Sequence, residues 1–293
     1  MTRVRIEAPA KLNLGLEVIG RRPDGFHEIR SILAMVDLVD TLSVERSAGT
    51  EVLRGSAVLG IDEADDLALR ALRTLQSSTQ INAGATLFLH KRIPAAAGLG
   101  GASSDAAAAL LAGRRAWGID VSDESLHEIA AGLGTDVPFF LNGPCALVRG
   151  TGTELESLPT LRTWAVIVTP RLKLQRKTAR LYRALEDGDY SDGRRIDAAV
   201  ATIRAAQVPL PETLANAFSR PLLKLEPSLA DLSRSMRQAG ATFVALSGSG
   251  GSHYTLIVEE EEARHVARRM QARLPKNVVV NVVPTRQTGL AIQ

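Results

Sequence analysis

The residues best suited to chemistry lie in one stretch, IPAAAGLGGASSDAAAALL (93–111), where small residues precede an alanine-rich segment of helix length. The stretch holds three closely spaced glycines, Gly98, Gly100 and Gly101. Glycine has no side chain to keep a ligand away from the backbone, and it adopts positive φ angles readily. Ser103, Ser104 and Asp105 are side chains typical of a helix N-cap. Because a helix start offers unpaired N–H groups and partial positive charge, the loop predicts an anion site, such as one for phosphate.

The alternative is an ordinary loop followed by a capped helix. We therefore compared the stretch with the common phosphate-binding motifs. A Walker loop requires a Gly-Lys pair, and the sequence contains none. The dinucleotide fingerprint G-x-G-x-x-G would begin at Gly98 but has Ser103 in place of its last glycine. The H-R-D and D-F-G elements of protein kinases are also missing from the sequence. The loop therefore belongs to none of these three classes.

A second pair of chemical side chains stands near the start of the chain, in AKLNLGLEVIG (10–20). Alternation with a period of two predicts a strand, whose successive side chains point to opposite faces. One face is expected to carry the apolar residues Leu12, Leu14, Leu16 and Val18. Lys11 and Asn13 fall on the other face, so they are expected to project together from a sheet.

Strands and helices alternate irregularly along the rest of the chain. Strand patterns occur at 29–45, 85–93, 146–149 and 163–170, and helix patterns at 65–76, 104–115, 122–131, 229–240 and 259–274. Pro138 and Pro144 are expected to break any helix between 134 and 146. This mixture predicts an α+β fold with a domain boundary near residue 155.

Four motifs together resemble those of a known kinase superfamily. The pattern P-x-x-x-G-L-G-G-x-S-S resembles the ATP-binding loop of the galactokinase–homoserine kinase–mevalonate kinase–phosphomevalonate kinase superfamily. Its residues here are Pro94, Ala95, Ala96, Ala97, Gly98, Leu99, Gly100, Gly101, Ala102, Ser103 and Ser104. Within the superfamily, PAKLNLGLEVIGRRPDGFHEI (9–29) resembles the opening motif of the 4-diphosphocytidyl-2-C-methyl-D-erythritol kinase family. The segments 134–155 and 245–257 resemble that family's catalytic-aspartate and C-terminal glycine motifs.

The resemblance implies phosphorylation by ATP, with Mg²⁺, of the 2-hydroxyl of 4-diphosphocytidyl-2-C-methyl-D-erythritol, in the non-mevalonate route to isoprenoid precursors. Lys11 and Asp136 fall on the family's catalytic pair. It further implies a two-domain small-molecule kinase with its active site in the cleft between the domains. Residues 1–155 would bind ATP and carry the catalytic groups, and residues 156–293 would bind the substrate.

The resemblance also implies a set of substrate-binding residues, Asn13, Phe26, His27, Thr178 and Tyr182. The family uses the position of His27 to contact the edge of the cytosine, and Phe26 stands where the family often has tyrosine. Thr178 and Tyr182 are four residues apart and so share a helical face. Each of the two could equally serve packing alone, and the glycines around Gly248 could form only a hairpin turn.

Composition limits the remaining possibilities. The chain of 293 residues has a formal net charge of +3 and no basic block interleaved with aromatic residues, so nucleic acid is not an expected partner. It contains no apolar run long enough to span a membrane and no apolar signal core. Cys145 is the only cysteine, which fits a reducing compartment and predicts a cytoplasmic protein. The resemblance implies that the partner is a small molecule linked to cytidine diphosphate, and oligomeric state stays open.

Two other functions are consistent with parts of this pattern. One is a kinase of the same superfamily that acts on homoserine or on a mevalonate derivative, although such substrates carry no pyrimidine for Phe26 and His27. The other is a regulatory nucleotide-binding protein without catalysis, which would be expected to lose Lys11 or Asp136.

Overall fold

The computed structural model describes residues 3–55, 62–171 and 177–292, and it contains two antiparallel-rich sheets with helices packed on each. In the described ranges the first sheet has six strands, β1 (Arg3–Arg21), β2 (His27–Ser47), β3 (Val52–Arg54), β4 (Gly84–His90), β5 (Cys145–Arg149) and β6 (Glu154–Ser157). The second has four, β7 (Trp164–Thr169), β8 (Ala245–Leu246), β9 (His253–Ile257) and β10 (Val279–Pro284). The predicted α+β class is confirmed.

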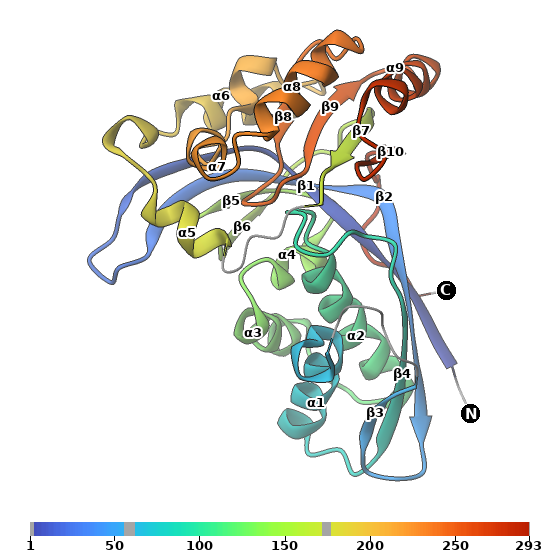
Figure 1. The fold of residues 1–293 in the computed structure, drawn as a ribbon. Helices are drawn as coiled ribbons and strands as arrows, with labels where there is room; N and C mark the ends of the chain where they lie inside the picture. The colour runs from blue at the N-terminus through green and yellow to red at the C-terminus, as the bar shows by residue number, and fades with distance from the viewer. Residues whose placement is uncertain (1–2, 56–61, 172–176, 293) are drawn as a thin grey trace.

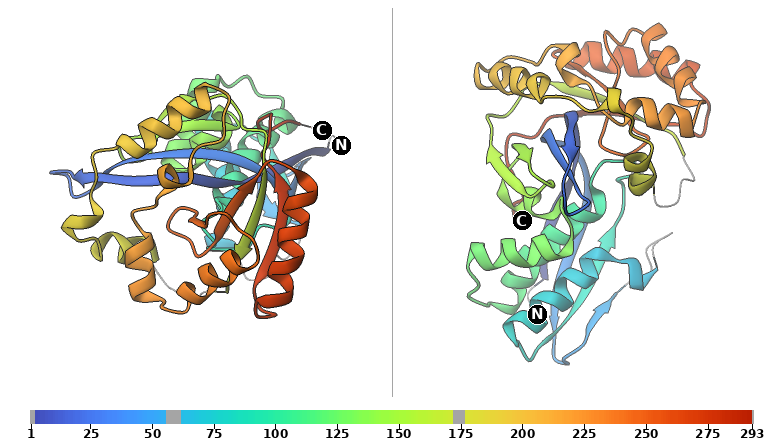
Figure 2. Two further views of the ribbon diagram at one scale, coloured as in Figure 1. Left: turned by 90° about the horizontal axis from the view of Figure 1, so that it is seen from above. Right: turned by 90° about the vertical axis from the view of Figure 1, so that its left-hand side faces the viewer.

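The helices form two groups at opposite ends of the molecule (Figures 1 and 2). The first group contains α1 (Leu67–Thr79), α2 (Gly101–Trp117), α3 (Asp123–Leu133) and α4 (Val137–Asn142). The second contains α5 (Lys177–Arg183), α6 (Arg194–Arg204), α7 (Ser219–Leu225), α8 (Leu229–Gln238) and α9 (Glu260–Arg273). Within the described ranges, no helix is long and apolar enough to cross a membrane.

A long hairpin of β1 and β2 runs between the two groups (Figure 1). Its apolar residues enter three separate cores in succession. Ile6 belongs to the core under α1 and α2, Leu12 to a central core, and Val18 to the core under the C-terminal helices. Because one hairpin contributes to all three cores, it fixes the two halves of the molecule relative to each other.

Two β-bulges change the alternation predicted for β1. Asn13 pairs with Leu33 and Leu16 with Ser31, so β1 gains one residue over its partner in that interval. Gly15 lies in this bulge at φ +85°. The bulge turns Leu16 onto the sheet face of Asn13, and its predicted place beside Leu12 is therefore wrong. A second irregularity follows between Val18 and Gly20.

The glycine loop joins β4 to α2, as its position between strand and helix patterns predicts. The helix begins at Gly101 with Gly100 as its N-cap, in a left-handed conformation at φ 72° and with no side-chain cap. Ser103, Ser104 and Asp105 therefore lie inside the helix, and their predicted role as N-caps is wrong. Small side chains let α2 pack closely, and Ala106 is fully buried.

Other predicted elements agree with the structure, with one exception. Ser122 caps α3 by accepting a hydrogen bond from Ser125 N, as its position before that helix suggests. Pro138 does not break a helix. It occupies the first turn of α4, where the backbone N–H groups make no hydrogen bond within the helix, so the missing N–H of proline has no cost. The boundary predicted at residue 155 falls within β6, which still pairs with β5 of the first sheet. A division of the chain into two domains there stays a prediction.

Candidate active site

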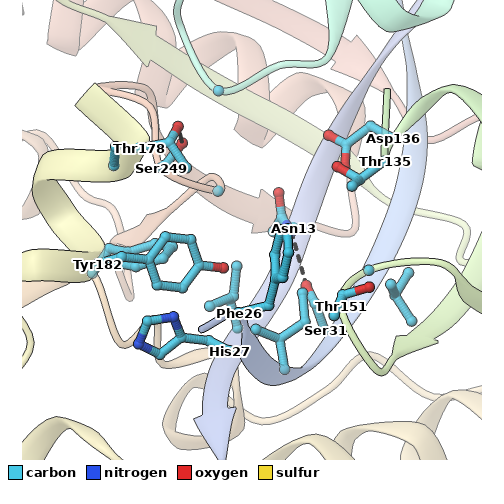
Figure 3. A pocket seen from close by; sticks show the side chains of 18 of the residues that line it. Asn13, Phe26, His27, Ser31, Thr135, Asp136, Thr151, Thr178, Tyr182 and Ser249 are labelled. Atoms are coloured by element: carbon cyan, nitrogen blue, oxygen red, sulfur yellow. Dashed lines mark hydrogen bonds between the residues drawn. The ribbon is translucent and has the colours of Figure 1, made fainter. Parts of the chain in front are cut away.

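The two halves of the chain enclose a cavity of about 1020 Å³. Most of its lining comes from the β1–β2 hairpin, the glycine loop, the segments 134–136 and 148–152, α5 and the loop 248–249, with Leu185, Tyr190 and Phe218 in addition. Figure 3 shows Asp136 on one side, Thr178 and Ser249 on the other, and Tyr182 with His27 at a further end. Residues from distant parts of the sequence thus share one site.

The hairpin supplies the floor of the cavity from one face of the sheet. On β2 the lining residues follow the strand period of two, His27, Ile29, Ser31 and Leu33. On β1 the lining residues are Lys11, Asn13, Leu16 and Arg21, whose spacing is stretched by the two bulges. The joint projection of Lys11 and Asn13 is confirmed, and the bulges add Leu16 and Arg21 to the same face.

Lys11 is the best-positioned charged group of the site. Its side chain is only 5% exposed, and its Nζ lies 3.4 Å from Asp136 Oδ2 and donates to Asn13 Oδ1 at 2.5 Å. Asn13 in turn donates to Ser31 Oγ at 2.8 Å, so its amide is fixed in one orientation. Asp136 keeps 38% of its side chain exposed toward the cavity. A buried ammonium therefore holds a carboxylate that still has room for a ligand.

The glycine loop is fastened to the same strand. Lys11 N donates to Leu99 O at 2.9 Å, and a Cβ at Gly100 would lie 2.8 Å from Lys11 Cγ. Glycine at 100 thus lets the start of α2 approach the Lys11 side chain. Among the predicted ATP-binding residues, three line the cavity: Gly98, Gly100 and Ser103.

The other loop residues lie around these three. Ala97, Leu99 and Ser104 are buried, Pro94 and Gly101 are half-buried, and Ala95, Ala96 and Ala102 are exposed. Ser104 Oγ has no hydrogen-bond partner in the described part of the chain, although it is fully buried. Of the two serines, Ser103 is thus the one that reaches the cavity.

A second glycine loop, residues 247–251, packs directly against the first. Ser247 Oγ donates to Gly98 O at 3.0 Å, and Ser252 N donates to Ala97 O at 3.2 Å. A Cβ at Gly98 would lie 2.3 Å from Ser247 O, and one at Gly250 would lie 1.9 Å from Ala97 O. The loop joins β8 to β9 as a turn, and Gly248 also lines the cavity.

A buried ionic cluster lies beneath the glycine loop. Lys91 Nζ contacts both Asp40 and Asp105, and Asp40 also accepts from Ile93 N at 2.8 Å. Burial raises the pKa of Asp105 to about 7, against the charge of Lys91 and with a contribution from Asp40. Asp105 does not line the cavity, so it anchors the loop from below instead of facing a phosphate.

Aromatic rings gather at the other end of the cavity. The rings of His27 and Tyr182 are stacked with centroids 4.5 Å apart (Figure 3). The ring centroid of Tyr190 lies 6.3 Å from that of His27. Burial, with a smaller effect of Arg21, lowers the pKa of His27 below its ordinary value of 6.5. The imidazole is therefore neutral at pH 7. Phe26, at the hairpin tip, is 65% exposed and leaves a ring face open to a ligand.

The two predicted residues on α5 both line the cavity. Tyr182 packs edge-on against Phe218 with centroids 4.9 Å apart, so one part of the ring is anchored in the core. Thr178 Oγ1 lies 2.6 Å from Ser249 Oγ, which ties α5 to the second glycine loop. Tyr182 thus packs against Phe218 and also lines the cavity.

Several lining residues were not foreseen from the sequence. Arg21 and Arg183 line the aromatic end, as does Tyr190. Lys177 lies behind the glycine loop and donates from Nζ to Ala96 O at 2.7 Å, and burial lowers its pKa to about 8. Arg183 directly follows Tyr182, a residue predicted to lie in the site, so its sequence position could have indicated it. Nothing in the sequence near Lys177 could have indicated its contact, because its partner Ala96 is 81 residues away in the chain.

Three further residues near the site are buried. Phe139 and Phe140 are 0% and 1% exposed. Cys145 is buried in β5, and burial raises the pKa of its thiol to about 12. The thiol therefore stays protonated at neutral pH.

Comparison with known proteins identifies close relatives over almost the whole chain. Residues 66–144 match the model of the GHMP kinases N terminal domain, and residues 200–276 match that of the GHMP kinases C terminal domain. A 4-diphosphocytidyl-2-C-methyl-D-erythritol kinase of Symbiobacterium thermophilum is 37% identical over 92% of this chain and 95% of its own length. The kinase of the same name from Gloeobacter violaceus is 33% identical over 100% of this chain and 98% of its own.

Solved structures give the same picture. The crystal structure of a 4-(cytidine 5'-diphospho)-2C-methyl-D-erythritol kinase superposes with a TM-score of 0.81 at 33% identity, covering 96% of this chain and 99% of the other. A homoserine kinase from Cytophaga hutchinsonii superposes with a TM-score of 0.78 at 19% identity, covering 100% of this chain and 98% of its own. The second likeness shows the fold alone.

Proposed function

The chain belongs to the 4-diphosphocytidyl-2-C-methyl-D-erythritol kinase family of the GHMP kinases, and from this premise we propose the reaction that it catalyses. It transfers the γ-phosphoryl group of ATP to the 2-hydroxyl of 4-diphosphocytidyl-2-C-methyl-D-erythritol, in the non-mevalonate route to isoprenoid precursors. The observation that carries this proposal is one cavity with the Lys11–Asp136 pair on one side and the His27–Tyr182 stack at another end.

Asp136 is the group suited to orient the acceptor hydroxyl. Its carboxylate is open to the cavity and is held by Lys11 Nζ at 3.4 Å. As the new O–P bond forms and the bond to the leaving ADP breaks, the carboxylate would accept the hydroxyl proton. In a loose phosphoryl transition state, positioning and charge stabilisation matter more than early deprotonation. Asp136 thus acts mainly by orienting the hydroxyl.

Lys11 has two roles in this scheme. Its ammonium lies 3.4 Å from Asp136 Oδ2 and so holds the carboxylate that would orient the hydroxyl. It also lies beside the glycine loop, where a Cβ at Gly100 would touch its side chain. From there it can offset negative charge on the transferring group. Asn13, which is hydrogen-bonded to Lys11 and Ser31, would fix the acceptor next to Lys11 and Asp136.

The glycine loop would hold the triphosphate of ATP. The start of α2 is open to the cavity at Gly100 and Ser103, and its first N–H groups have no partner inside the helix. A helix of 17 residues brings the partial positive charge of its N-terminus to this point. The exposed and half-buried residues 94–96 are the adjoining surface on which the rest of ATP would lie.

Aromatic side chains would recognise the cytosine. Phe26 and Tyr182 offer ring faces for stacking, and neutral His27 offers one ring N–H and one lone pair to the base edge. Thr178, one turn before Tyr182 on α5, also lines the cavity. Base stacking on an aromatic ring contributes about 1–3 kcal/mol, so this end can supply much of the acceptor affinity.

Mg²⁺ is the metal that ATP chemistry implies, and the cavity fits it in the usual way. Mg²⁺ is commonly held by one or two carboxylates together with substrate phosphates and water. Asp136 and Ser103 are oxygen-bearing side chains of the cavity wall that would help to hold it. When bound, the metal supplies charge neutralisation of the phosphates.

The remaining expectations belong to the same proposal. The partner is a small molecule, and neither nucleic acid nor a membrane is part of the function. The cytoplasm is the proposed compartment, and the single, buried Cys145 supports a reducing environment. In this proposal residues 1–155 supply the glycine loop and the catalytic pair, and both parts contribute to acceptor binding, through Asn13, Phe26 and His27 in the first and α5 in the second.

An acceptor competition experiment tests this function. The purified protein would receive Mg²⁺-ATP with the cytidine-linked acceptor, homoserine or mevalonate, and ADP release would be followed. We expect ADP release with the cytidine compound and none with homoserine or mevalonate. Faster turnover with homoserine or mevalonate would leave the kinase assignment intact but overturn the roles of Phe26 and His27. Tight ATP binding without turnover on any acceptor would favour a regulatory protein.

A further inference from the structure

Two arginines on the cavity wall stand outside every role described above. We propose that Arg21 and Arg183 bind the diphosphate of the acceptor and so select a nucleoside diphosphate over a free nucleoside. This inference rests on the proposed function, because it assigns a further part of the same substrate to residues at the same site.

Arg21 reaches the cavity through the geometry of the hairpin. It pairs directly with His27 across β1 and β2, and cross-strand partners present their side chains on the same face. The irregularity between Val18 and Gly20 sets this register. Both side chains accordingly line the cavity, and the charge of Arg21 contributes to the lowered pKa of His27.

The neighbouring arginine behaves differently. Arg22 is held by two carboxylates, with Nε 3.1 Å from Asp24 and Nη1 3.1 Å from Glu28. Arg22 does not line the cavity. The hairpin therefore directs one arginine into the site and neutralises the next one outside it.

Arg183 comes from the opposite wall. It directly follows Tyr182 near the end of α5, and both residues line the cavity together with Ala179 one turn earlier. Arg180 lies on the same helix and is exposed like Arg183, but it does not line the cavity. Each wall of the aromatic end thus presents one guanidinium.

The charges of the cavity wall are unbalanced toward positive. Its Lys, Arg, Asp and Glu residues are Lys11, Arg21, Arg183 and Asp136. Lys11 and Asp136 pair with each other. Across the described residues, neither Arg21 nor Arg183 has a carboxylate oxygen within 4.0 Å. With His27 neutral, two unmatched positive charges remain at this end.

A diphosphate diester supplies two negative charges, which match these two guanidinium groups. In a cytidine diphosphate compound the diphosphate is attached to the ribose of the base. A base held by His27 and Tyr182 therefore brings the diphosphate close to the arginines that neighbour these two residues. Guanidinium groups form bidentate, charge-assisted hydrogen bonds to phosphate, which makes them suited to this role.

Ligand binding to four arginine variants tests the proposal. Cytidine, CDP and ADP would be titrated calorimetrically into the wild type, Arg21→Gln and Arg183→Gln. Arg22→Gln and Arg180→Gln are the matched controls, because each removes a neighbouring guanidinium that does not line the cavity. We expect each site variant to weaken CDP binding about tenfold, as the loss of a charge-assisted contact predicts, and to leave cytidine binding within about twofold. The controls should bind all three ligands like the wild type.

Steady-state kinetics add a readout that a merely structural role would not move. In Arg21→Gln and Arg183→Gln the KM of the acceptor should rise about tenfold, with kcat and the KM of ATP unchanged. Arg21→Lys should restore part of the loss, because it keeps the charge but not the fork of donors.

Three outcomes would overturn the proposal or its premise. Unchanged CDP affinity in both site variants would show that the arginines do not bind the diphosphate. A loss of ADP affinity in place of CDP affinity would assign them to the phosphates of ATP. A wild-type protein that binds neither cytidine nor CDP would contradict the proposed function itself, which separates that failure from failure of the arginine pair.

Discussion

Ser247 Oγ donates a 3.0 Å hydrogen bond to the carbonyl of Gly98, and this bond joins two glycine-rich loops that are 149 residues apart in the chain. The same hydroxyl lies 3.2 Å from Asn13 N and accepts its hydrogen bond. One serine thus links the second glycine loop, the first glycine loop and the strand that carries Lys11. The phosphate loop is therefore braced from the C-terminal half of the chain.

The contact between the loops predicts a strong effect of Gly250→Ala. The new Cβ would lie 1.9 Å from Ala97 O, so the loops must separate. We expect the KM of ATP to rise about tenfold or more and the protein to be less stable by about 1–3 kcal/mol, as for overpacking of a tight contact. Kinetics and urea denaturation would measure both effects.

Gly132→Ala is the matched control for this substitution. Gly132 lies within α3, and a Cβ there would have no atom within 4 Å. Alanine is favoured over glycine inside helices by about 1 kcal/mol, so the control should be neutral or more stable. Wild-type kinetics in Gly250→Ala would contradict the account of the interlocked loops.

The stack of His27 and Tyr182 predicts a difference between two substitutions at one position. Tyr182→Phe keeps the ring and should leave the KM of the acceptor within about twofold, whereas Tyr182→Ala removes it. Because base–aromatic stacking is worth about 1–3 kcal/mol, we expect the alanine variant to raise this KM about tenfold to a hundredfold. The KM of ATP should stay unchanged in both. Equal acceptor KM values for the two variants would remove Tyr182 from base recognition.

The buried cluster beneath the glycine loop predicts a pH-dependent stability. Burial raises the pKa of Asp105 from 3.8 to about 7, so the folded protein keeps a proton that the unfolded chain has lost. A raised carboxyl pKa lowers stability as pH rises from about 4 toward 7, with a limiting slope of about 1.4 kcal/mol per pH unit. Asp105→Asn removes this titration while Asp40 keeps its contact with Lys91.

Urea denaturation at pH 5 and pH 7.5 would measure this effect. The free energy of unfolding of Asp105→Asn minus that of the wild type should be larger at pH 7.5 than at pH 5, because only the wild type loses stability as the pH rises. The exposed Asp120→Asn variant is the control and should show no such change. A difference independent of pH would mean that Asp105 is already ionised at pH 5.

Sequence patterns predicted the parts of the site that are local in the chain. The glycine loop between a strand and a helix follows from residue types within 85–115 alone. The projection of Lys11 and Asn13 follows from a period of two that holds until the first bulge. The position of Asp136 in the site required the resemblance to a family, since its own neighbours indicated only a turn before Pro138.

Features made by distant parts of the chain could not be predicted in this way. The faces of Leu16 and Arg21 depend on bulges whose register is set by pairing with β2. The contact of Asp40 with Lys91 joins residues 51 positions apart, and it places Asp105 under the loop although the residue resembled a cap. Pairing register and buried charge depend on the packed structure, so no local pattern contains them.

The most direct test of the central claim is ADP release by Asp136→Asn with Mg²⁺-ATP and the cytidine-linked acceptor. The amide keeps the shape of the side chain but cannot accept the hydroxyl proton or attract Lys11 Nζ, which lies 3.4 Å away. We predict that kcat falls about 10²- to 10⁴-fold, as for loss of a positioned acid–base group, while CDP and ADP still bind. Asp120→Asn should keep wild-type turnover. Wild-type turnover in Asp136→Asn would contradict the account, because the Lys11–Asp136 pair would then not be the catalytic centre.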